Sequence, residues 1–352
     1  MTDAVAGAPV LVWVAWPPAC GPTVVDAITA VDPRVEVIAC GYEEDGALRH
    51  ARTRQDVSDA ARADALAALT PAQRDVMARA DVVFGFDVPF ELADAAPRLR
   101  WVQGIGSGYE HIWGAGLHRD GIVVTNAVGV SAVPMAEFVL GRILQRWKRF
   151  PEIEDHAQRH EWRPTFGRML AGSTVGIIGL GAIGSALAER ASVLGMRVLA
   201  SRRSWQPGMT APHADALYGP GDLHALLAES DAVVLCAPST AETRRMIDAD
   251  ALAAMKPGAL FVNVGRGTMI DEPALIDVLE RGHVGAAVLD VTSEEPLPAD
   301  NPLWDAPNVF ISAHCSATSD GYVERVLAVF VDNLARYLAG DPLRNVVDAG
   351  AV

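Results

Sequence analysis

The sequence has few basic residues, few cysteines, few aromatic residues and no long hydrophobic run. Among its 352 residues, 29 Lys or Arg stand against 44 Asp or Glu, which gives a formal net charge of −15. Because this charge repels a phosphate backbone, we expect no nucleic-acid partner. Four scattered cysteines without a CxxC pair exclude a disulfide-stapled scaffold, so we expect reduced thiols, a cytoplasmic location and no bound metal.

The N-terminal residues also lack the features of a targeting or membrane-spanning segment. Asp3 stands where a signal peptide carries basic charge, and the apolar run that follows has the length of a strand. We therefore expect no contact with a membrane. Half of the residues are hydrophobic and 21% are charged, which at this length predicts a globular protein of two domains.

Short apolar runs alternate with alanine-rich helical stretches along most of the chain. The first series of predicted strands comprises residues 10–15, 35–40, 80–85, 100–103 and 122–125, with helical stretches such as residues 56–69 between them. The second series comprises residues 174–178, 197–201, 232–236, 260–264, 285–289 and 309–311. Strands that alternate with helices predict parallel sheets covered by helices, which is the α/β class.

Two longer helices are predicted outside these two series. Residues 132–150 contain Pro134 near their start and are predicted to form one long helix. This helix is apolar enough to bury surface against a second copy, so we expect a homodimer. Residues 322–338 have apolar residues at helical spacing and stop before Gly340, a typical helix end.

A glycine-rich segment follows the first strand of the second series. Gly179, Gly181 and Gly184 match the pattern GxGxxG, between the apolar strand STVGII and an alanine-rich helix. The first glycine permits a tight turn, the second lets the backbone approach a pyrophosphate, and the third lets helix and strand pack closely. We predict a dinucleotide site that includes Ala182 and Ile183; the alternative is a glycine-rich turn in a structural βα unit.

The strand after this motif ends in residues that favour one dinucleotide over the other. An NAD enzyme usually offers Asp or Glu here to the adenosine ribose, whereas this chain has Ser201, Arg202 and Arg203. A hydroxyl and two guanidinium groups can bind a 2′-phosphate, which a carboxylate would repel. We therefore predict a preference for NADP(H), with NAD(H) as a second cofactor. The alternative is that both arginines are ordinary surface residues.

Three polar segments follow later strands of the second series, where an open parallel sheet places its ligand crevice. They are residues 263–267 (NVGRG), residues 289–298 (LDVTSEEPLP) and residues 312–314 (SAH). Together with GLGAIG, these segments resemble the D-isomer-specific 2-hydroxyacid dehydrogenase family. The resemblance extends over roughly the whole chain and is most specific from residue 179 to residue 314.

The resemblance implies an α/β fold of two Rossmann-like domains with parallel sheets and an active site in the cleft between them. It implies a substrate-binding domain formed by residues 1–126 plus 321–352. The NAD(P)-binding domain would comprise residues 127–320.

The resemblance also assigns three catalytic roles, and the chemistry of the side chains suits them. It identifies Arg266 as the substrate-binding arginine, Glu295 as the catalytic glutamate and His314 as the acid/base histidine. A guanidinium can grip a carboxylate or a keto oxygen in a fixed fork. Histidine can donate a proton near neutral pH, and a glutamate beside it favours the imidazolium and fixes its orientation.

Further contacts are implied by the same resemblance. Along the nicotinamide half of the cofactor it places Cys236, Ala237, Pro238 and Thr243, with Val264, Gly265 and Asp290 nearby. The Pro-Ser-Thr sequence is also consistent with an ordinary turn. Gly104, Ile105 and Gly106 would receive the substrate carboxylate on backbone N–H groups, which side chains would otherwise block.

The sequence departs from the family pattern in the loops that carry the histidine and the glutamate. Ala313 replaces the usual proline before the histidine and Cys315 follows it, so we expect a less rigid loop there. Thr292 and Ser293 replace the usual Phe-Glu after Asp-Val, which alters the loop that carries the glutamate.

Other histidines and acidic residues are predicted to lie on the surface. The sequence shows no candidate catalytic partner for His111 or His118, and Glu294 is predicted to face solvent.

The expected activity is NADPH-dependent reduction of a small 2-keto acid, such as glyoxylate or hydroxypyruvate, to the D-2-hydroxy acid. Oxidation of formate or phosphite on the same fold is a second hypothesis, which a Gln in place of Glu295 would favour. A third is a dinucleotide-sensing protein of the corepressor type, in which the catalytic residues can be retained.

Overall fold

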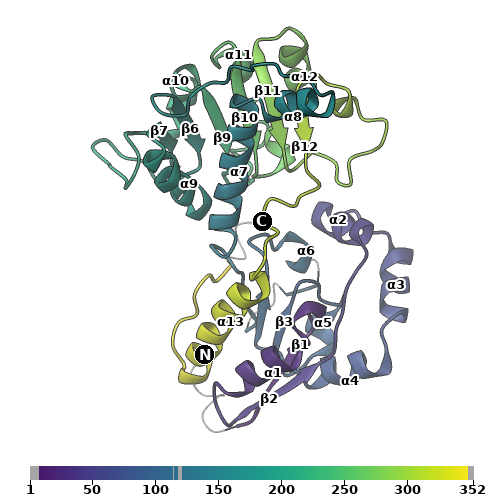
Figure 1. The fold of residues 1–352 in the computed structure, drawn as a ribbon. Helices are drawn as coiled ribbons and strands as arrows, with labels where there is room; N and C mark the ends of the chain where they lie inside the picture. Colours follow the sequence, from purple (N-terminus) through teal and green to yellow (C-terminus); the bar gives the residue numbers. More distant parts are fainter. Residues whose placement is uncertain (1–7, 114, 118–120, 348–352) are drawn as a thin grey trace. The chain divides into compact units, whose positions relative to one another are not determined.

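The computed structural model describes residues 8–113, 115–117 and 121–347. The chain divides into two compact units, one formed by Met1–Val130 with Asp320–Val352 and the other by Ser131–Ser319. Each unit contains one parallel sheet with helices packed on it (Figure 1). The predicted α/β class with two Rossmann-like parts is confirmed.

The first unit has a five-stranded sheet in the order β2-β1-β3-β4-β5. Its strands are β1 (Val10–Val14), β2 (Val35–Ala39), β3 (Val82–Gly85), β4 (Trp101–Gly104) and β5 (Val123–Thr125). Its helices are α1 (Pro22–Thr29), α2 (Gly46–Arg54), α3 (Asp59–Ala67), α4 (Pro71–Arg79), α5 (Leu92–Ala95), α6 (Glu110–Trp113) and α13 (Tyr322–Ala339). All neighbouring strands are parallel, so their carboxyl ends meet at one edge.

The core of this unit explains why its strands are continuous apolar runs. All five residues of β1 are buried, because successive side chains pack on opposite faces of the sheet. Val12 belongs to a cluster with Phe84 and Phe330, whereas Trp13 belongs to a separate cluster. Phe330, from α13, stacks on Phe84 with ring centroids 4.4 Å apart. The C-terminal helix therefore completes the core built by the N-terminal strands.

The second unit has a seven-stranded sheet in the order β12-β11-β10-β9-β6-β7-β8. Its strands are β6 (Thr174–Ile178), β7 (Arg197–Ser201), β8 (Ala216–Tyr218), β9 (Ala232–Leu235), β10 (Ala259–Asn263), β11 (Val284–Leu289) and β12 (Val309–Ile311). Its helices are α7 (Ala132–Trp147), α8 (Phe150–Gln158), α9 (Ala182–Val193), α10 (Leu223–Glu229), α11 (Ala249–Ala253) and α12 (Glu272–Glu280). The strand order reverses between β6 and β9, which is where doubly wound sheets bind ligands.

Residues 132–150 do not form the single helix that was predicted. Helix α7 ends at Trp147 and α8 begins at Phe150, with Arg149 in the left-handed conformation at φ 58° between them. Pro151 explains the break, because its ring and its missing N–H would disrupt a continuous helix through Trp147. Among the described helices, none has both the length and the apolar character that crossing a bilayer requires.

Candidate active site

The predicted dinucleotide motif lies in the tight turn between β6 and α9. Gly179 has a φ of 104°, and a side chain there would collide with the backbone of Ala237. A side chain at Gly184 would collide with the carbonyl of Gly179, whereas the space around Gly181 is open. Gly181 is the N-cap of α9, where the positive end of the helix dipole lies. This cradle fits a pyrophosphate of a dinucleotide.

The residues at the end of β7 lie directly against this turn. The carbonyl oxygen of Ser201 accepts hydrogen bonds from the N–H groups of Gly179 and Leu180, at 3.2 and 3.0 Å. Arg202 and Arg203 follow and are exposed. The structure therefore brings the glycine motif and the predicted 2′-phosphate residues together.

The segment after β9 closes the other side of the glycine turn. The thiol of Cys236 donates to the carbonyl of Gly179 at 3.1 Å, and burial raises the pKa of this thiol to about 12. The hydroxyl of Thr243 donates to the carbonyl of Pro238 at 2.8 Å and accepts from the N–H of Thr240 at 2.7 Å. Thr243 therefore shapes the turn that follows Pro238.

The same segment is electrostatically linked to the end of β7. The pKa of the Glu242 carboxyl is lowered, chiefly by a hydrogen bond from the Thr240 hydroxyl and in smaller part by the charge of Arg203. The loop after β9 therefore lies within electrostatic range of the arginine after β7.

Arg266 lies in a turn that the last residue of β10 holds. The side chain of Asn263 donates to the carbonyl of Arg266 at 3.1 Å and accepts from the N–H of Gly265 at 3.0 Å. One guanidinium nitrogen of Arg266 donates to the carbonyl of Gly265 at 2.9 Å. Val264, also predicted to lie near the cofactor, is buried at the start of this turn.

His314 and Glu295 are in direct contact. His314 lies after β12 and Glu295 after β11, and Nδ1 of the imidazole is 2.9 Å from Oε2 of the carboxylate. The second carboxylate oxygen of Glu295 accepts from the N–H of Thr292 at 3.1 Å. The His314 side chain is 50% exposed, against 20% for Glu295. A carboxylate that fixes an accessible imidazole is the arrangement required of a general acid and its orienting group.

Asp290 holds the loop that carries His314. Its buried carboxylate accepts from the hydroxyl of Ser312 at 2.7 Å and from the N–H groups of Cys315 and Ser316 at 2.9 and 3.0 Å. It also accepts from the Ser316 hydroxyl. His314, with a φ of 51°, sits in the left-handed region that few residues with side chains adopt. The loop therefore keeps its shape through Asp290, although it lacks the family's proline.

The predicted substrate loop of the first unit is held by its carbonyl groups. The carbonyl of Ile105 accepts from the Tyr322 hydroxyl at 2.8 Å, and that of Gly106 accepts from the N–H of Ala127 at 2.8 Å. In a trans peptide the next N–H points opposite to the carbonyl. The N–H groups of Gly106 and Ser107 are therefore turned away from Tyr322 and Ala127. Gly104 ends β4 immediately before this loop.

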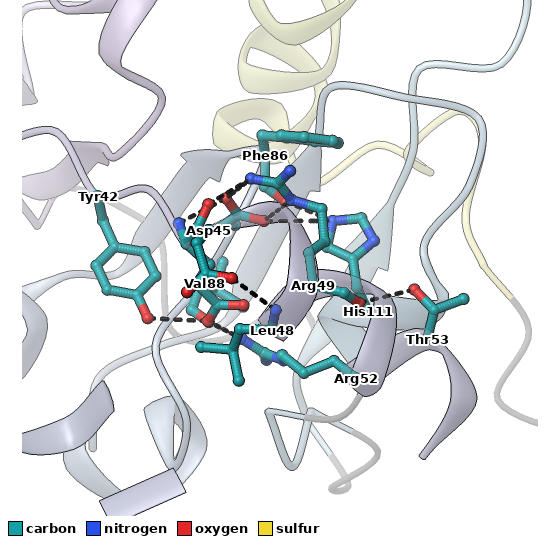
Figure 2. A network of polar contacts seen from close by, with 11 residues as sticks. Tyr42, Asp45, Leu48, Arg49, Arg52, Thr53, Phe86, Val88 and His111 are labelled. Carbon is teal, nitrogen blue, oxygen red and sulfur yellow. Dashed lines mark hydrogen bonds and ion pairs between the residues drawn. The ribbon is translucent and has the colours of Figure 1, made fainter. Parts of the chain in front are cut away.

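The prediction that His111 is a surface residue is wrong. His111 is 7% exposed and its Nε2 lies 2.8 Å from the carbonyl of Phe86, so this nitrogen carries the proton (Figure 2). Burial lowers the pKa of His111 and keeps the ring neutral. His118 lies outside the described residues. Glu294 is exposed.

His111 borders a buried ionic network that the sequence analysis missed. Two guanidinium nitrogens of Arg49 donate to Asp87, at 2.6 and 2.7 Å, and Arg52 pairs with Glu44 (Figure 2). The Tyr42 hydroxyl donates to Glu44 at 2.9 Å. Charged residues spaced along α2 are the usual pattern of a solvated helix, so no sequence signal marked them as buried. The network ties α2 to the segment that follows β3.

Comparison with known proteins adds to this geometry. Residues 140–316 match the family model described as D-isomer specific 2-hydroxyacid dehydrogenase, NAD binding domain. The chain is 35% identical over 274 residues to glyoxylate/hydroxypyruvate reductase B of Pectobacterium atrosepticum, covering 75% of this chain and 83% of that one. It is 32% identical over 272 residues to the glyoxylate reductase of Korarchaeum cryptofilum, covering 74% and 80%.

Solved structures share the fold over nearly the whole chain. A D-isomer specific 2-hydroxyacid dehydrogenase family protein from Aeromonas salmonicida is 27% identical with a TM-score of 0.79, covering 97% of this chain and 99% of that one. An NADPH-dependent glyoxylate/hydroxypyruvate reductase from Sinorhizobium meliloti, in complex with NADP and sulfate, is 26% identical with a TM-score of 0.74, covering 98% and 99%.

The chain belongs to the D-isomer specific 2-hydroxyacid dehydrogenase family. It is an oxidoreductase that uses a nicotinamide dinucleotide, and its relatives act on small 2-keto acids, as the names of the reductases above state.

Proposed function

We propose that this protein reduces a small 2-keto acid, of the glyoxylate or hydroxypyruvate type, to the D-2-hydroxy acid with NADPH. The observation that carries this proposal is the 2.9 Å contact between His314 and Glu295, at the carboxyl edge of the sheet that bears the glycine turn. A bound nicotinamide dinucleotide would be the source of the hydride. His314 would donate its proton to the alkoxide that forms, and Glu295 would orient the imidazole.

Backbone and guanidinium groups would bind the substrate. Arg266 grips the carboxylate or the keto oxygen, because its planar fork can make two parallel hydrogen bonds. The loop formed by Gly104, Ile105 and Gly106 has N–H groups that are suited to receive the carboxylate. Its carbonyls are already bonded to Tyr322 and Ala127 of the same unit.

The glycine turn and the segment after β9 would hold the cofactor. Gly181 leaves the space at the start of α9 open for the pyrophosphate, beside Ala182 and Ile183, while Gly179 and Gly184 allow the close backbone packing of the turn. The backbone of the segment after β9, from Cys236 to Pro238 with Thr243, would lie along the nicotinamide half. Asp290, with Val264 and Gly265, would border the carboxamide while also holding the His314 loop.

Preference for NADPH rests on the end of β7. Ser201, Arg202 and Arg203 offer one hydroxyl and two positive charges next to the glycine turn. A 2′-phosphate gains charge-assisted hydrogen bonds there, while the 2′-hydroxyl of NADH gains little. The Sinorhizobium meliloti reductase is itself described as NADPH-dependent, which agrees with this choice.

Two further parts of the proposal concern assembly and location. Helices α7 and α8 expose Val133, Phe150 and Ile153, each above 40%, and a homodimer would cover such apolar side chains. Light scattering that gave the mass of one chain would contradict the dimer. The four free cysteines agree with a reducing cytoplasm.

A substrate panel tests the activity. The purified protein is assayed with glyoxylate, hydroxypyruvate, pyruvate and bulkier 2-keto acids, with NADPH and NADH side by side, and with formate and phosphite in the oxidising direction. We expect turnover of the smallest keto acids with NADPH. Turnover of formate or phosphite alone would replace the reaction, and tight dinucleotide binding without turnover would favour a corepressor-like sensor.

A further inference from the structure

The loop that carries Glu295 is fastened to the neighbouring helix by one serine. The N–H of Ser293 donates to Oε1 of Glu272 at 2.7 Å, and the Ser293 hydroxyl donates to Oε2 of the same carboxylate at 2.6 Å. Both oxygens of Glu272 are thus used by a single residue, which makes the contact directional as well as attractive.

Glu272 is a firm point of attachment. It is the first residue of α12, where the positive end of the helix stabilises a carboxylate. Leu275, Val278 and Leu279 of the same helix are buried in the core of the second unit. The backbone of Glu272 is therefore fixed with the helix, and its carboxylate is held by the two bonds from Ser293.

The peptide between Thr292 and Ser293 has little freedom on its other side. A side chain at Gly267 would overlap this peptide, so the turn that follows Arg266 packs directly on it. Thr292 is buried, and its hydroxyl donates to the carbonyl of Glu294 at 2.7 Å. The loop is held between the Arg266 turn and α12.

From this peptide the hydrogen bonds continue to the imidazole. The N–H of Thr292 donates to Glu295, and Glu295 contacts Nδ1 of His314. A shift of this loop after the loss of one hydrogen bond would move the Glu295 carboxylate relative to the His314 ring. Misplacement by about 1 Å is enough to cost roughly 100-fold in rate at a catalytic site.

We propose that Ser293 and Glu272 form a latch that positions Glu295 against His314. They are positioning residues, since neither contacts the imidazole. The inference rests on the proposed function for its kinetic test only, because the geometry of the Glu295 and His314 pair can also be measured in the absence of turnover.

The kinetic experiment compares Ser293→Ala with Ser293→Thr, which keeps the hydroxyl. We expect Ser293→Ala to lower kcat about 10-fold with an NADPH KM within two-fold of the parent, and Ser293→Thr to restore kcat to within three-fold. Ser192→Ala is the matched control, because that hydroxyl also donates a hydrogen bond, to the carbonyl of Glu189 on the surface of α9. It should leave kcat unchanged.

Double-mutant cycles separate positioning from general stability. In a Glu272→Ala background, Ser293→Ala should have no further effect, because the latch is already open. In a His314→Ala background it should change the residual rate by less than two-fold. A 10-fold loss that persisted without His314 would overturn the proposal.

Crystal structures of Ser293→Ala and the parent supply the readout that needs no activity. We expect the distance from Glu295 to His314 to lengthen beyond 3.5 Å in the variant, or Glu295 to occupy two conformers. An unchanged pair in the variant would overturn the latch whether or not the protein reduces keto acids. A parent with the pair in place but no turnover of any keto acid would count against the proposed function alone.

Discussion

Substitution of Asp290 should affect both the stability of the second unit and the catalytic rate. Its carboxylate accepts four hydrogen bonds from Ser312, Cys315 and Ser316, on either side of His314. In Asp290→Ala the two backbone N–H groups among these donors lose their acceptor, whereas the serine hydroxyls can rotate toward other partners. Each buried N–H without a partner costs about 1–3 kcal/mol. The N–H of Ser316 is buried and that of Cys315 is only partly buried, so the second group costs less. We therefore expect a loss of about 2–4 kcal/mol in the free energy of unfolding.

Asp290→Asn should be milder because the amide oxygen can replace the oxygen that accepts three of the four bonds. The loss of charge assistance then leaves a cost of about 1 kcal/mol. Both variants should lower kcat, in the same order as their stabilities, because the left-handed backbone of His314 is no longer enforced.

Urea unfolding followed by tryptophan fluorescence, together with steady-state kinetics, measures both effects. Asp277→Ala is the matched control, since Asp277 is an exposed carboxylate paired with Arg281 on the surface of α12. It should cost less than about 0.5 kcal/mol. An Asp290→Ala variant as stable as this control, with normal kcat, would refute the role of Asp290 in holding the His314 loop. A large increase in the cofactor Kd with unchanged stability would instead assign Asp290 to cofactor binding alone.

Four further variants test the proposed roles in the same assays. Replacing Arg202 and Arg203 together by Ala should raise the NADPH KM at least 10-fold, about 1.4 kcal/mol, and leave the NADH KM nearly unchanged; equal changes for both cofactors would contradict the 2′-phosphate site. His314→Ala should lower kcat by roughly 10²–10⁴-fold with NADPH still bound, as measured by fluorescence titration. Glu295→Gln keeps the size of the side chain but removes its charge, which weakens the contact with Nδ1 of His314, so kcat should fall while the NADPH KM stays nearly unchanged; an unchanged kcat would contradict the pairing. Arg266→Lys should raise the keto-acid KM strongly and lower kcat as well, and an unchanged KM would exclude the proposed substrate-binding role of Arg266.

Features that depend on local sequence could be predicted well. The glycine turn is an example, because only glycine tolerates the φ of Gly179 and the closeness of Gly184 to the preceding carbonyl. The helix from Tyr322 was also predicted to within a residue of its observed end, since its apolar spacing and Gly340 both mark it. In each case the determining interaction lies within a few residues.

Features that depend on distant partners could not be predicted. Asp290 was assigned to the cofactor by resemblance, and nothing in its neighbourhood of the sequence shows that Ser316, 26 residues away, would bond to it. His111 is expected on the surface because the sequence shows no candidate catalytic partner for it, whereas its partner is the carbonyl of Phe86, 25 residues earlier. The break of the predicted long helix has a local cause, Pro151, but that residue lies just beyond the predicted range.

The candidate acid and its orienting group come from different strand ends, and this explains how the chain can hold an uncommon backbone at His314. A left-handed residue with a side chain costs about 1–2 kcal/mol, which a flexible loop would relieve by rotating away. Here His314 is held at the backbone by its own N–H, which donates to the carbonyl of Asp290 at 2.9 Å, and at the ring by Glu295. Both holding residues belong to the segment after β11, so the position of the imidazole depends on one loop. That loop is the one Ser293 fastens to α12. Substitutions at Ser293 or Glu272 should therefore change proton donation by His314 more than they change cofactor binding.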